Sequence, residues 1–363
     1  MPAEAGPGGS ARHPGHAYGA PLSATAVVNR QTPSPAPSID DLLRLAAGDM
    51  KAVDGLIRSR MESPVSVIPA LADHLIAAGG KRLRPLLTVA AARMARQGRG
   101  AGEAAHKLAA AVEFIHTATL LHDDVVDSSR LRRGKVAAHL IWGAPSSVLV
   151  GDFLFARAFE LMVETDSMRA LKILAEASRV IAEGEVLQLT RAHDLRLEQT
   201  TYLEIITAKT AELFAAAAEA GGVAAGGTEA QITALRDYGL NLGLAFQLAD
   251  DALDYAGTSE ALGKNTGDDF HEGKATLPLL LAVARAGPAD TAFWERAVNP
   301  SQRAEGDFRR ARELVAASGA LRDTLDTAAD YAVAAKASLR AFSPGEWRAA
   351  LEALADFAVS RAA

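Results

Sequence analysis

Two short acidic segments have the composition of a metal site. The first is His-Asp-Asp-Val-Val-Asp at 122–127, and the second is Ala-Asp-Asp-Ala-Leu-Asp at 249–254. In a helix, the first and last aspartates of the first segment lie one turn apart on one face. Carboxylates this close repel one another unless a cation lies between them, and oxygen-only ligands suit Mg²⁺. One such cluster could be a solvated acidic face, but the repeated Asp-Asp-x-x-Asp spacing among apolar neighbours favours two metal-binding faces.

A diphosphate is the ligand that such faces would hold. Magnesium keeps part of its water shell and shares the rest with substrate phosphates. Two metal-loaded faces across the interior of a helical protein could therefore clamp a diphosphate between them. Neither segment has the glycine and the final glutamate of an EF-hand loop at the required offsets.

Basic residues that could bind the same diphosphate occur in several places. Gly-Gly-Lys-Arg-Leu-Arg-Pro at 79–85 combines positive charge with glycines that let a backbone approach a ligand, although basic residues also end helices. Arg-Leu-Arg-Arg-Gly at 130–134 follows the first acidic segment directly and could instead be a solvated face. Lys209-Thr210 alone is typical of a surface pair, and His116 alone of a hydrogen-bonded core histidine. The glycine-rich stretch 263–269 is not a P-loop, but Lys264 within it could reach the site.

The overall composition restricts the possible functions. The chain has 363 residues, 49% hydrophobic and 23% charged, as in ordinary globular proteins. A net charge of -6 argues against a strongly basic nucleic-acid binder, so we expect no nucleic-acid partner. Without cysteine there is no thiolate nucleophile and no cysteine-bound metal. No uninterrupted apolar run reaches the roughly 18 residues of a transmembrane helix, and we expect a cytoplasmic protein.

The chain divides into an N-terminal tail, 1–38, and a helical domain, 39–363. Seven of the 15 prolines lie in the tail, which we predict to be disordered because it buries too little apolar surface. In the domain, apolar residues recur at helical spacing, and only one proline occurs between Leu86 and Leu277. The sequence therefore predicts an all-α domain of about ten helices. Breaks are expected at 79–80, 98–102, 143–145, 221–228 and 257–269.

Longer motifs occur in a familiar order. They are Gly-Gly-Lys-Arg-Leu-Arg-Pro, Leu-Leu-His-Asp-Asp-Val-Val-Asp with Leu-Arg-Arg-Gly, Gly-Asp-Phe-Leu, Lys-Thr-Ala, Phe-Gln-Leu-Ala-Asp-Asp-Ala-Leu-Asp-Tyr and Gly-Lys-Ala-Thr-Leu-Pro. From residue 39 to 363 the chain resembles the trans-polyprenyl diphosphate synthases, and looks closest to their octaprenyl-type long-chain members. The resemblance implies a single-domain antiparallel helix bundle of the isoprenoid synthase type, with about ten or more helices around a central cavity. Ala275 replaces a proline common in the family, which should loosen that loop slightly without changing the chemistry.

The resemblance also implies roles for individual residues. Asp123, Asp127 and Asp250 would hold Mg²⁺, three ions per site with substrate bound, and Asp124, Asp251 and Asp254 would complete the catalytic set. Isopentenyl diphosphate would be bound by Lys81, Arg84, His116 and Arg133. The allylic diphosphate would face Arg132, Lys209, Thr210, Gln247 and Lys264. The small residues Ala118 and Thr119 would let the growing tail pass, and Met162 and Leu174 are candidates for the floor that stops it.

The implied reaction is Mg²⁺-dependent prenyl transfer without a protein nucleophile. The allylic diphosphate, expected to be farnesyl diphosphate, ionises, and the double bond of isopentenyl diphosphate attacks the cation. We expect a C40 product, with C50 as the alternative, that supplies quinone side chains. A homodimer is expected, with only transient membrane contact for product release.

Three alternatives remain open at this stage. A terpene cyclase or squalene-synthase-like enzyme shares the fold, but cyclases usually carry a different second metal motif. A phosphohydrolase could use His122-Asp123, but it would need further metal-binding histidines. A non-catalytic subunit of a heteromeric prenyl synthase usually lacks aspartates from the clusters, whereas both clusters are complete here.

Overall fold

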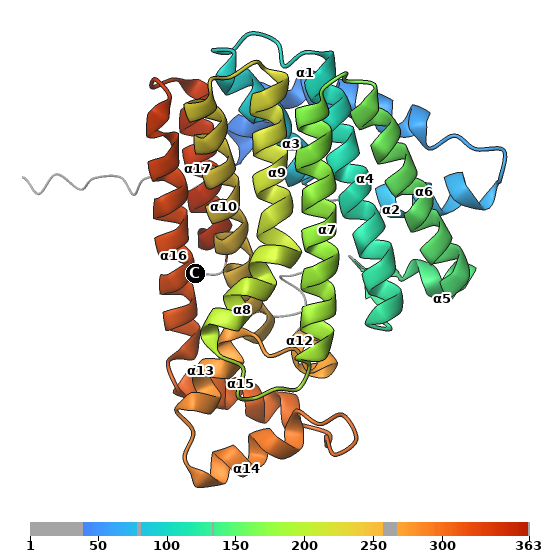
Figure 1. Cartoon of the computed structure of the whole chain (residues 1–363). Helices are drawn as coiled ribbons and strands as arrows, with labels where there is room; N and C mark the ends of the chain where they lie inside the picture. The colour runs from blue at the N-terminus through green and yellow to red at the C-terminus, as the bar shows by residue number, and fades with distance from the viewer. Residues whose placement is uncertain (1–38, 78–80, 133, 257–266, 362–363) are drawn as a thin grey trace, which may run out of the picture. The chain divides into compact units, whose positions relative to one another are not determined.

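The computed structural model describes residues 39–77, 81–132, 134–256 and 267–361. This part of the chain is almost entirely helical (Figure 1), which confirms the predicted all-α class. The predicted tail lies outside the described residues and stays a prediction. No described helix has both the length and the apolar character needed to cross a membrane.

The helices follow one another with short connections. In the first half they are α1 (Asp40–Arg60), α2 (Val67–Ala77), α3 (Leu83–Ala95), α4 (Glu103–Val126), α5 (Ala138–Trp142), α6 (Ala144–Val163) and α7 (Met168–Thr190). In the second half they are α8 (Gln199–Ile206), α9 (Glu212–Ala224), α10 (Glu229–Ala256), α12 (Asp268–Glu272), α13 (Leu277–Ala284), α14 (Pro288–Ala297), α15 (Asp307–Ala317), α16 (Ala320–Ser338) and α17 (Glu346–Ser360). A π-helix, η1 (Thr207–Ala211), joins α8 to α9, and a 3-10 helix, η2 (Leu339–Ala341), follows α16. Strands β1 (Leu131–Arg132) and β2 (Lys135–Val136) pair antiparallel after α4.

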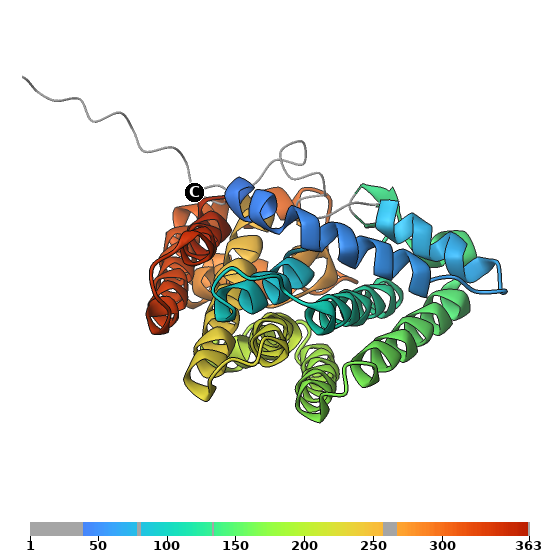
Figure 2. The same cartoon turned by 90° about the horizontal axis from the view of Figure 1, so that it is seen from above.

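Helix α9 lies at the centre of the bundle. Nine of its 13 residues are buried, because the helix is apolar except for Glu212 and Glu219. It packs against α3, α4, α7 and α10, and Figure 1 shows these long helices side by side. Figure 2 shows the same bundle from above, with α1 lying across α3 and α4. The two helices that carry the aspartate motifs, α4 and α10, therefore both contact one central helix.

Glycine permits the closest of these helix contacts. A Cβ atom at Gly221 would lie 2.2 Å from the carbonyl oxygen of Thr88 on α3, so only glycine fits there. The expected break at 221–228 is therefore wrong at its start, because α9 continues through Gly221 to Ala224. The signal was misleading because these glycines serve helix packing rather than a turn.

The segment after α10 has an apolar core of its own. Phe270, Leu279, Trp294 and Val315 are among its buried members, and Tyr255 at the end of α10 packs with them. Asp254, the last aspartate of the second motif, accepts hydrogen bonds from the backbone N–H groups of Gly267 and Asp269, at 3.0 and 3.2 Å. These contacts fix the start of α12 next to the acidic end of α10.

Candidate active site

Three motif aspartates face a common cavity of about 600 Å³. Asp123 lies in the last turn of α4, and Asp127 caps that helix, with its N–H donating to the Asp123 carbonyl at 2.7 Å. Asp250 reaches the same cavity from α10. The helical spacing therefore places the expected metal ligands on the walls of one cavity.

The other three motif aspartates are buried and hydrogen-bonded to the protein, although Oδ2 of Asp124 has no hydrogen-bond partner. Asp124 accepts a hydrogen bond from Nε of Arg132 at 2.8 Å. Asp251 accepts from the Tyr202 hydroxyl at 2.6 Å and from Nε2 of Gln247 at 2.7 Å. Asp254 caps the start of α12, as described above. Within each motif the structure thus separates cavity-facing carboxylates from carboxylates that hold the wall in place.

The donor set fits Mg²⁺. Asp123, Asp127 and Asp250 offer only oxygen atoms, which this hard cation prefers. Among the described residues, no three His, Cys, Asp or Glu side chains stand close enough together to hold an ion alone. Such incomplete protein ligation suits Mg²⁺, because it usually completes its shell with water and substrate phosphate.

The charges around the cavity are strongly affected by burial. Burial raises the pKa of the Asp123 carboxyl to about 7, against the attraction of Lys209, and Glu185 and Asp127 add to the rise. Desolvation lowers the pKa of Lys274, but the nearby carboxylates, Asp269 first, outweigh it and keep this pKa above its usual value. The site therefore combines carboxylates that are costly to keep charged with an ammonium group that is firmly charged.

Three of the four residues expected to bind isopentenyl diphosphate line the cavity: Lys81, Arg84 and His116. Nη1 of Arg84 donates to Nε2 of His116 at 3.1 Å, and the Arg84 guanidinium lies 4.4 Å from the ring centre of Phe214. Nζ of Lys81 lies 4.0 Å from the ring centre of Phe357. Arg133, the fourth, lies outside the described residues.

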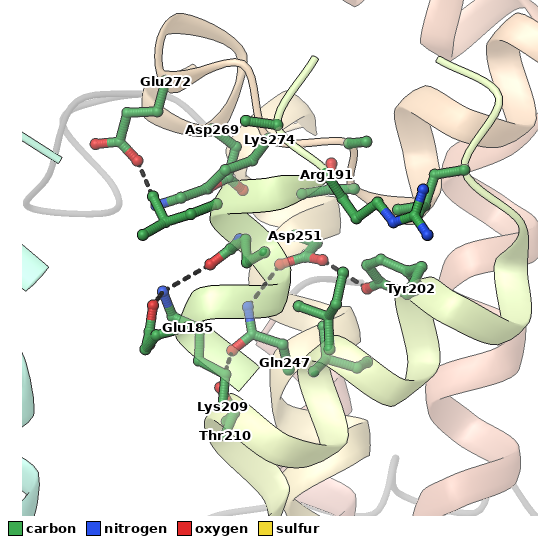
Figure 3. A pocket seen from close by; sticks show the side chains of 18 of the residues that line it. Glu185, Arg191, Tyr202, Lys209, Thr210, Gln247, Asp251, Asp269, Glu272 and Lys274 are labelled. Atoms are coloured by element: carbon green, nitrogen blue, oxygen red, sulfur yellow. Dashed lines mark hydrogen bonds and ion pairs between the residues drawn. The ribbon is translucent and has the colours of Figure 1, made fainter. Parts of the chain in front are cut away.

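Four of the five residues expected to face the allylic diphosphate line the same cavity: Arg132, Lys209, Thr210 and Gln247. Lys209 and Thr210 belong to the π-helix η1, and such bulges are frequent at functional sites. The Thr210 hydroxyl donates to Oε1 of Gln247 at 2.9 Å, and Gln247 donates in turn to Asp251. This chain orients the Gln247 amide (Figure 3). Lys264, the fifth, lies outside the described residues.

The residues expected to govern product length lie on three helices of the bundle, α4, α6 and α7. Thr119 lines the cavity, and its hydroxyl donates to the carbonyl of His116 at 2.8 Å. Ala118 on α4, Met162 on α6 and Leu174 on α7 are buried. These positions are compatible with a tail path along α4, and the floor assignment stays a prediction.

Several cavity residues were missed by the sequence analysis. Lys274, Glu272 and Glu185 line the cavity, as does Arg361 from the end of the chain. The Arg361 guanidinium lies 3.8 Å from the ring centre of Phe246, and its Nη2 lies 3.6 Å from Asp250. Lys274 stood within the Gly-Lys-Ala-Thr-Leu-Pro motif, so that motif held a signal. Glu185 and Arg361 belong to none of the motifs, so the sequence held no signal for either residue.

Carboxylate faces and basic side chains around one cavity in an all-helical bundle define a metal-dependent enzyme that acts on diphosphates. Comparisons with known proteins agree. Residues 65–315 match the model of the family described as polyprenyl synthetase. The chain is 43% identical over 328 residues to the octaprenyl diphosphate synthase of Escherichia coli K12, covering 89% of this chain and 99% of that protein.

Solved structures give the same result. A polyprenyl synthase from Caulobacter crescentus CB15, complexed with calcium and isoprenyl diphosphate, is 71% identical with a TM-score of 0.88, covering 91% of this chain and all of that one. A decaprenyl diphosphate synthase from Rhodobacter capsulatus is 50% identical with a TM-score of 0.84, over 90% of this chain and all of that one. The chain belongs to the polyprenyl synthetase family, whose members are Mg²⁺-dependent prenyltransferases. The resemblance seen in the sequence is thereby confirmed.

Proposed function

We propose that this protein is a long-chain trans-polyprenyl diphosphate synthase. It condenses isopentenyl diphosphate with an allylic diphosphate, farnesyl diphosphate in our proposal, to a C40 product, with C50 as the alternative. The observation that carries the proposal is the meeting of two carboxylate faces and two groups of basic side chains in one cavity. Relatives named as octaprenyl and decaprenyl synthases support the long-chain type. Use of the product for quinone side chains fits that length.

In this proposal the cavity residues divide into three groups. Asp123, Asp127 and Asp250 hold the magnesium, three ions with substrate bound, with Asp124, Asp251 and Asp254 supporting them. Lys81, Arg84 and His116 bind isopentenyl diphosphate together with Arg133. Arg132, Lys209, Thr210 and Gln247 orient the allylic diphosphate together with Lys264. Magnesium, when bound, supplies Lewis-acid stabilisation of the charge on the leaving diphosphate.

The protein's own part in the reaction is alignment and exclusion of water. The basic groups hold the allylic carbon within reach of the isopentenyl double bond while the carbon–oxygen bond of the allylic substrate breaks. A carbon–carbon bond forms between the substrates, and a proton leaves the new product to the departing diphosphate. The apolar helical wall, which includes Leu120, Phe214 and Phe246, keeps water from quenching the allylic cation.

A single incubation tests the proposed function. Purified full-length protein is mixed with labelled isopentenyl diphosphate, farnesyl diphosphate and Mg²⁺, and the product is sized by chromatography. We expect a main product of C40 or C50 and no product when the metal is chelated. Absence of any condensation would favour a non-catalytic subunit, and a cyclised or C20 product would contradict the long-chain assignment.

We also propose that the protein is a homodimer. Four large apolar side chains on the adjacent helices α5 and α6 are exposed: Leu140, Ile141, Val148 and Leu149. Exposed apolar side chains gathered on neighbouring elements are typical of protein–protein contacts. A second copy of the chain would cover them.

A further inference from the structure

Two lysines at the cavity each link a motif aspartate to a glutamate from another helix. Nζ of Lys274 lies 2.9 Å from Asp127 and also donates to Glu272. Nζ of Lys209 lies 2.7 Å from Glu185 and 4.0 Å from Asp123. Both aspartates that project from the end of α4 therefore have an ammonium group beside them, and each ammonium group has a glutamate of its own.

The two glutamates are held in place by their own elements. Glu185 lies on α7, where Gln188, one turn later, also accepts from Nζ of Lys209 at 2.8 Å. Glu272 ends α12, whose start is capped by Asp254. Figure 3 shows Glu272 beside Lys274, and Glu185 beside Lys209, around the smaller pocket of about 120 Å³ next to the main cavity. Each lysine is thus fixed by a partner outside the aspartate motifs.

Metal binding would weaken the aspartates as partners of these lysines. In the proposed function Asp123 and Asp127 give oxygen atoms to Mg²⁺, and a divalent cation on a carboxylate repels an ammonium group beside it. A lysine side chain has many rotamers and is a compact point charge, so it must be held if it is to meet a diphosphate oxygen. Once metal is bound, Glu272 would remain the hydrogen-bond partner of Lys274, and Glu185 would remain the charged partner of Lys209, beside the neutral Gln188.

We propose that Glu185 and Glu272 are positioning residues, which tether Lys209 and Lys274 beside the aspartates and keep the two ammonium groups aimed at the metal-bound diphosphate. The inference rests on the proposed function and assigns two residues that the motifs do not include. Before substrate binds, the tethered lysines balance the charge of the carboxylates on α4. After binding, the same lysines lie beside the anion without having to move far.

The direction in which diphosphate affinity changes when a glutamate is neutralised distinguishes a positioning role from a purely electrostatic one. Removing a negative charge from the wall of an anion-binding cavity should by itself tighten diphosphate binding. Loss of a charged tether should weaken diphosphate binding, because the lysine is then held less firmly and adopts other rotamers more often. Glu272→Gln and Glu185→Gln keep the size of the side chain and remove only its charge, so they separate the two effects.

The measurement is calorimetric binding of inorganic diphosphate at saturating Mg²⁺ to the full-length protein. We expect Glu272→Gln and Glu185→Gln each to weaken binding about tenfold, as expected for one charge-assisted contact. The KM for the allylic substrate should rise in parallel, while that for isopentenyl diphosphate stays within about twofold. Glu272→Asp, which keeps the charge, should recover part of the loss. The matched control is Glu103→Gln, whose glutamate pairs with Lys107 at 2.9 Å on the surface, and this variant should bind normally.

A double-mutant cycle then asks whether each glutamate acts through its lysine. In a Lys274→Met background, Glu272→Gln should have no further effect on diphosphate affinity. If Lys274→Met does not fold, as judged by circular dichroism, the cycle of Glu185→Gln with Lys209→Met decides instead. Additive losses, or tighter binding in the single glutamate variants, would overturn the inference. Because wild-type protein would still bind diphosphate and condense substrates in that case, the proposed function would be unaffected.

Discussion

At the level of single residues, Asp123 and Asp124 are neighbours with opposite surroundings. Asp123 faces the cavity, whereas Asp124 is buried against Arg132. The Asp-Asp-x-x-Asp spacing alone predicts that both are acidic and close together, but it does not say which one meets the solvent-filled space. Helix rotation decides that, and it depends on how α4 packs.

Substituting these two aspartates should therefore give different results. Asp123→Ala is expected to lower kcat by several orders of magnitude and to leave the metal-free protein as stable as before or slightly more so, because a repelling carboxylate is removed. Asp124→Ala should destabilise the fold by about 2 kcal/mol, less than for a fully buried pair since Arg132 is 31% exposed. Thermal unfolding in the presence of a chelator measures the stability of both variants, and steady-state turnover with Mg²⁺ measures their kcat. Near-normal turnover of Asp123→Ala would contradict the metal assignment.

Arg84 allows the two substrate subsites to be told apart. Arg84→Ala should raise the KM for isopentenyl diphosphate by about tenfold or more, because it removes a charge-assisted contact, and should affect the KM for the allylic substrate much less. Initial rates with each substrate varied in turn give both constants. Equal changes in both would show that the subsites are wrongly assigned.

At the scale of elements, the π-helix η1 depends on its neighbour α7. A Cβ atom at Gly184 would lie 2.6 Å from Cβ of Ala208 and 3.1 Å from the backbone nitrogen of Lys209. Contacts below about 3 Å force one of the two helices to shift. Gly184 thus sets how closely α7 approaches the segment that carries Lys209 and Thr210.

We expect Gly184→Ala to reduce kcat by about tenfold or more through displacement of Lys209. It should also cost about 2 kcal/mol of stability from overpacking. A Cβ atom at Gly48 in α1 would meet no other atom within 4 Å, so Gly48→Ala should raise stability by about 1 kcal/mol and leave kcat unchanged. Chemical denaturation and steady-state kinetics on both variants test this. A fully active Gly184→Ala protein would mean that η1 tolerates the shift.

We also predict that one element, α4, governs product length through Ala118 and Thr119. Ala118→Phe or Thr119→Phe should truncate the product to C15–C20, with metal dependence kept, because an aromatic ring would block the path toward the start of the helix. Chromatographic sizing of the products of both variants checks this prediction. Unchanged length in both would show that the tail takes another route, and that the small side chains serve helix packing.

The helical class, the cavity-lining aspartates and most of the basic cavity residues could be predicted because each has a local signal. Spacing within one helix revealed Asp123 and Asp127, and the Lys-Thr-Ala motif revealed Lys209. Arg361 could not be found this way, since only the packing of α17 beside α10 brings it to Asp250. Glu185 could not be found either, because its proposed role depends on Lys209, which lies 24 positions later in the chain.

At the scale of the whole molecule, the exposed apolar side chains of α5 and α6 predict a partner. Wild-type protein should have twice the chain mass in light scattering, and Leu149→Asp should shift it toward the monomer, because a charge would be buried in the contact. Lys172, exposed on α7, provides a control: Lys172→Asp should leave the mass unchanged. A wild-type monomer would contradict the homodimer.

The shared cavity has a consequence for how the chain would elongate its product. In the proposed function, the lengthened molecule would carry its diphosphate at Lys81 and Arg84 after each condensation, and would have to present it at Lys209 for the next round. All three residues line one cavity, so this transfer needs no release into solution. A tail already bound along α4 would hold the intermediate in the cavity and keep its local concentration high. Synthesis would then be processive, and intermediates of middle length would stay scarce even when isopentenyl diphosphate is limiting.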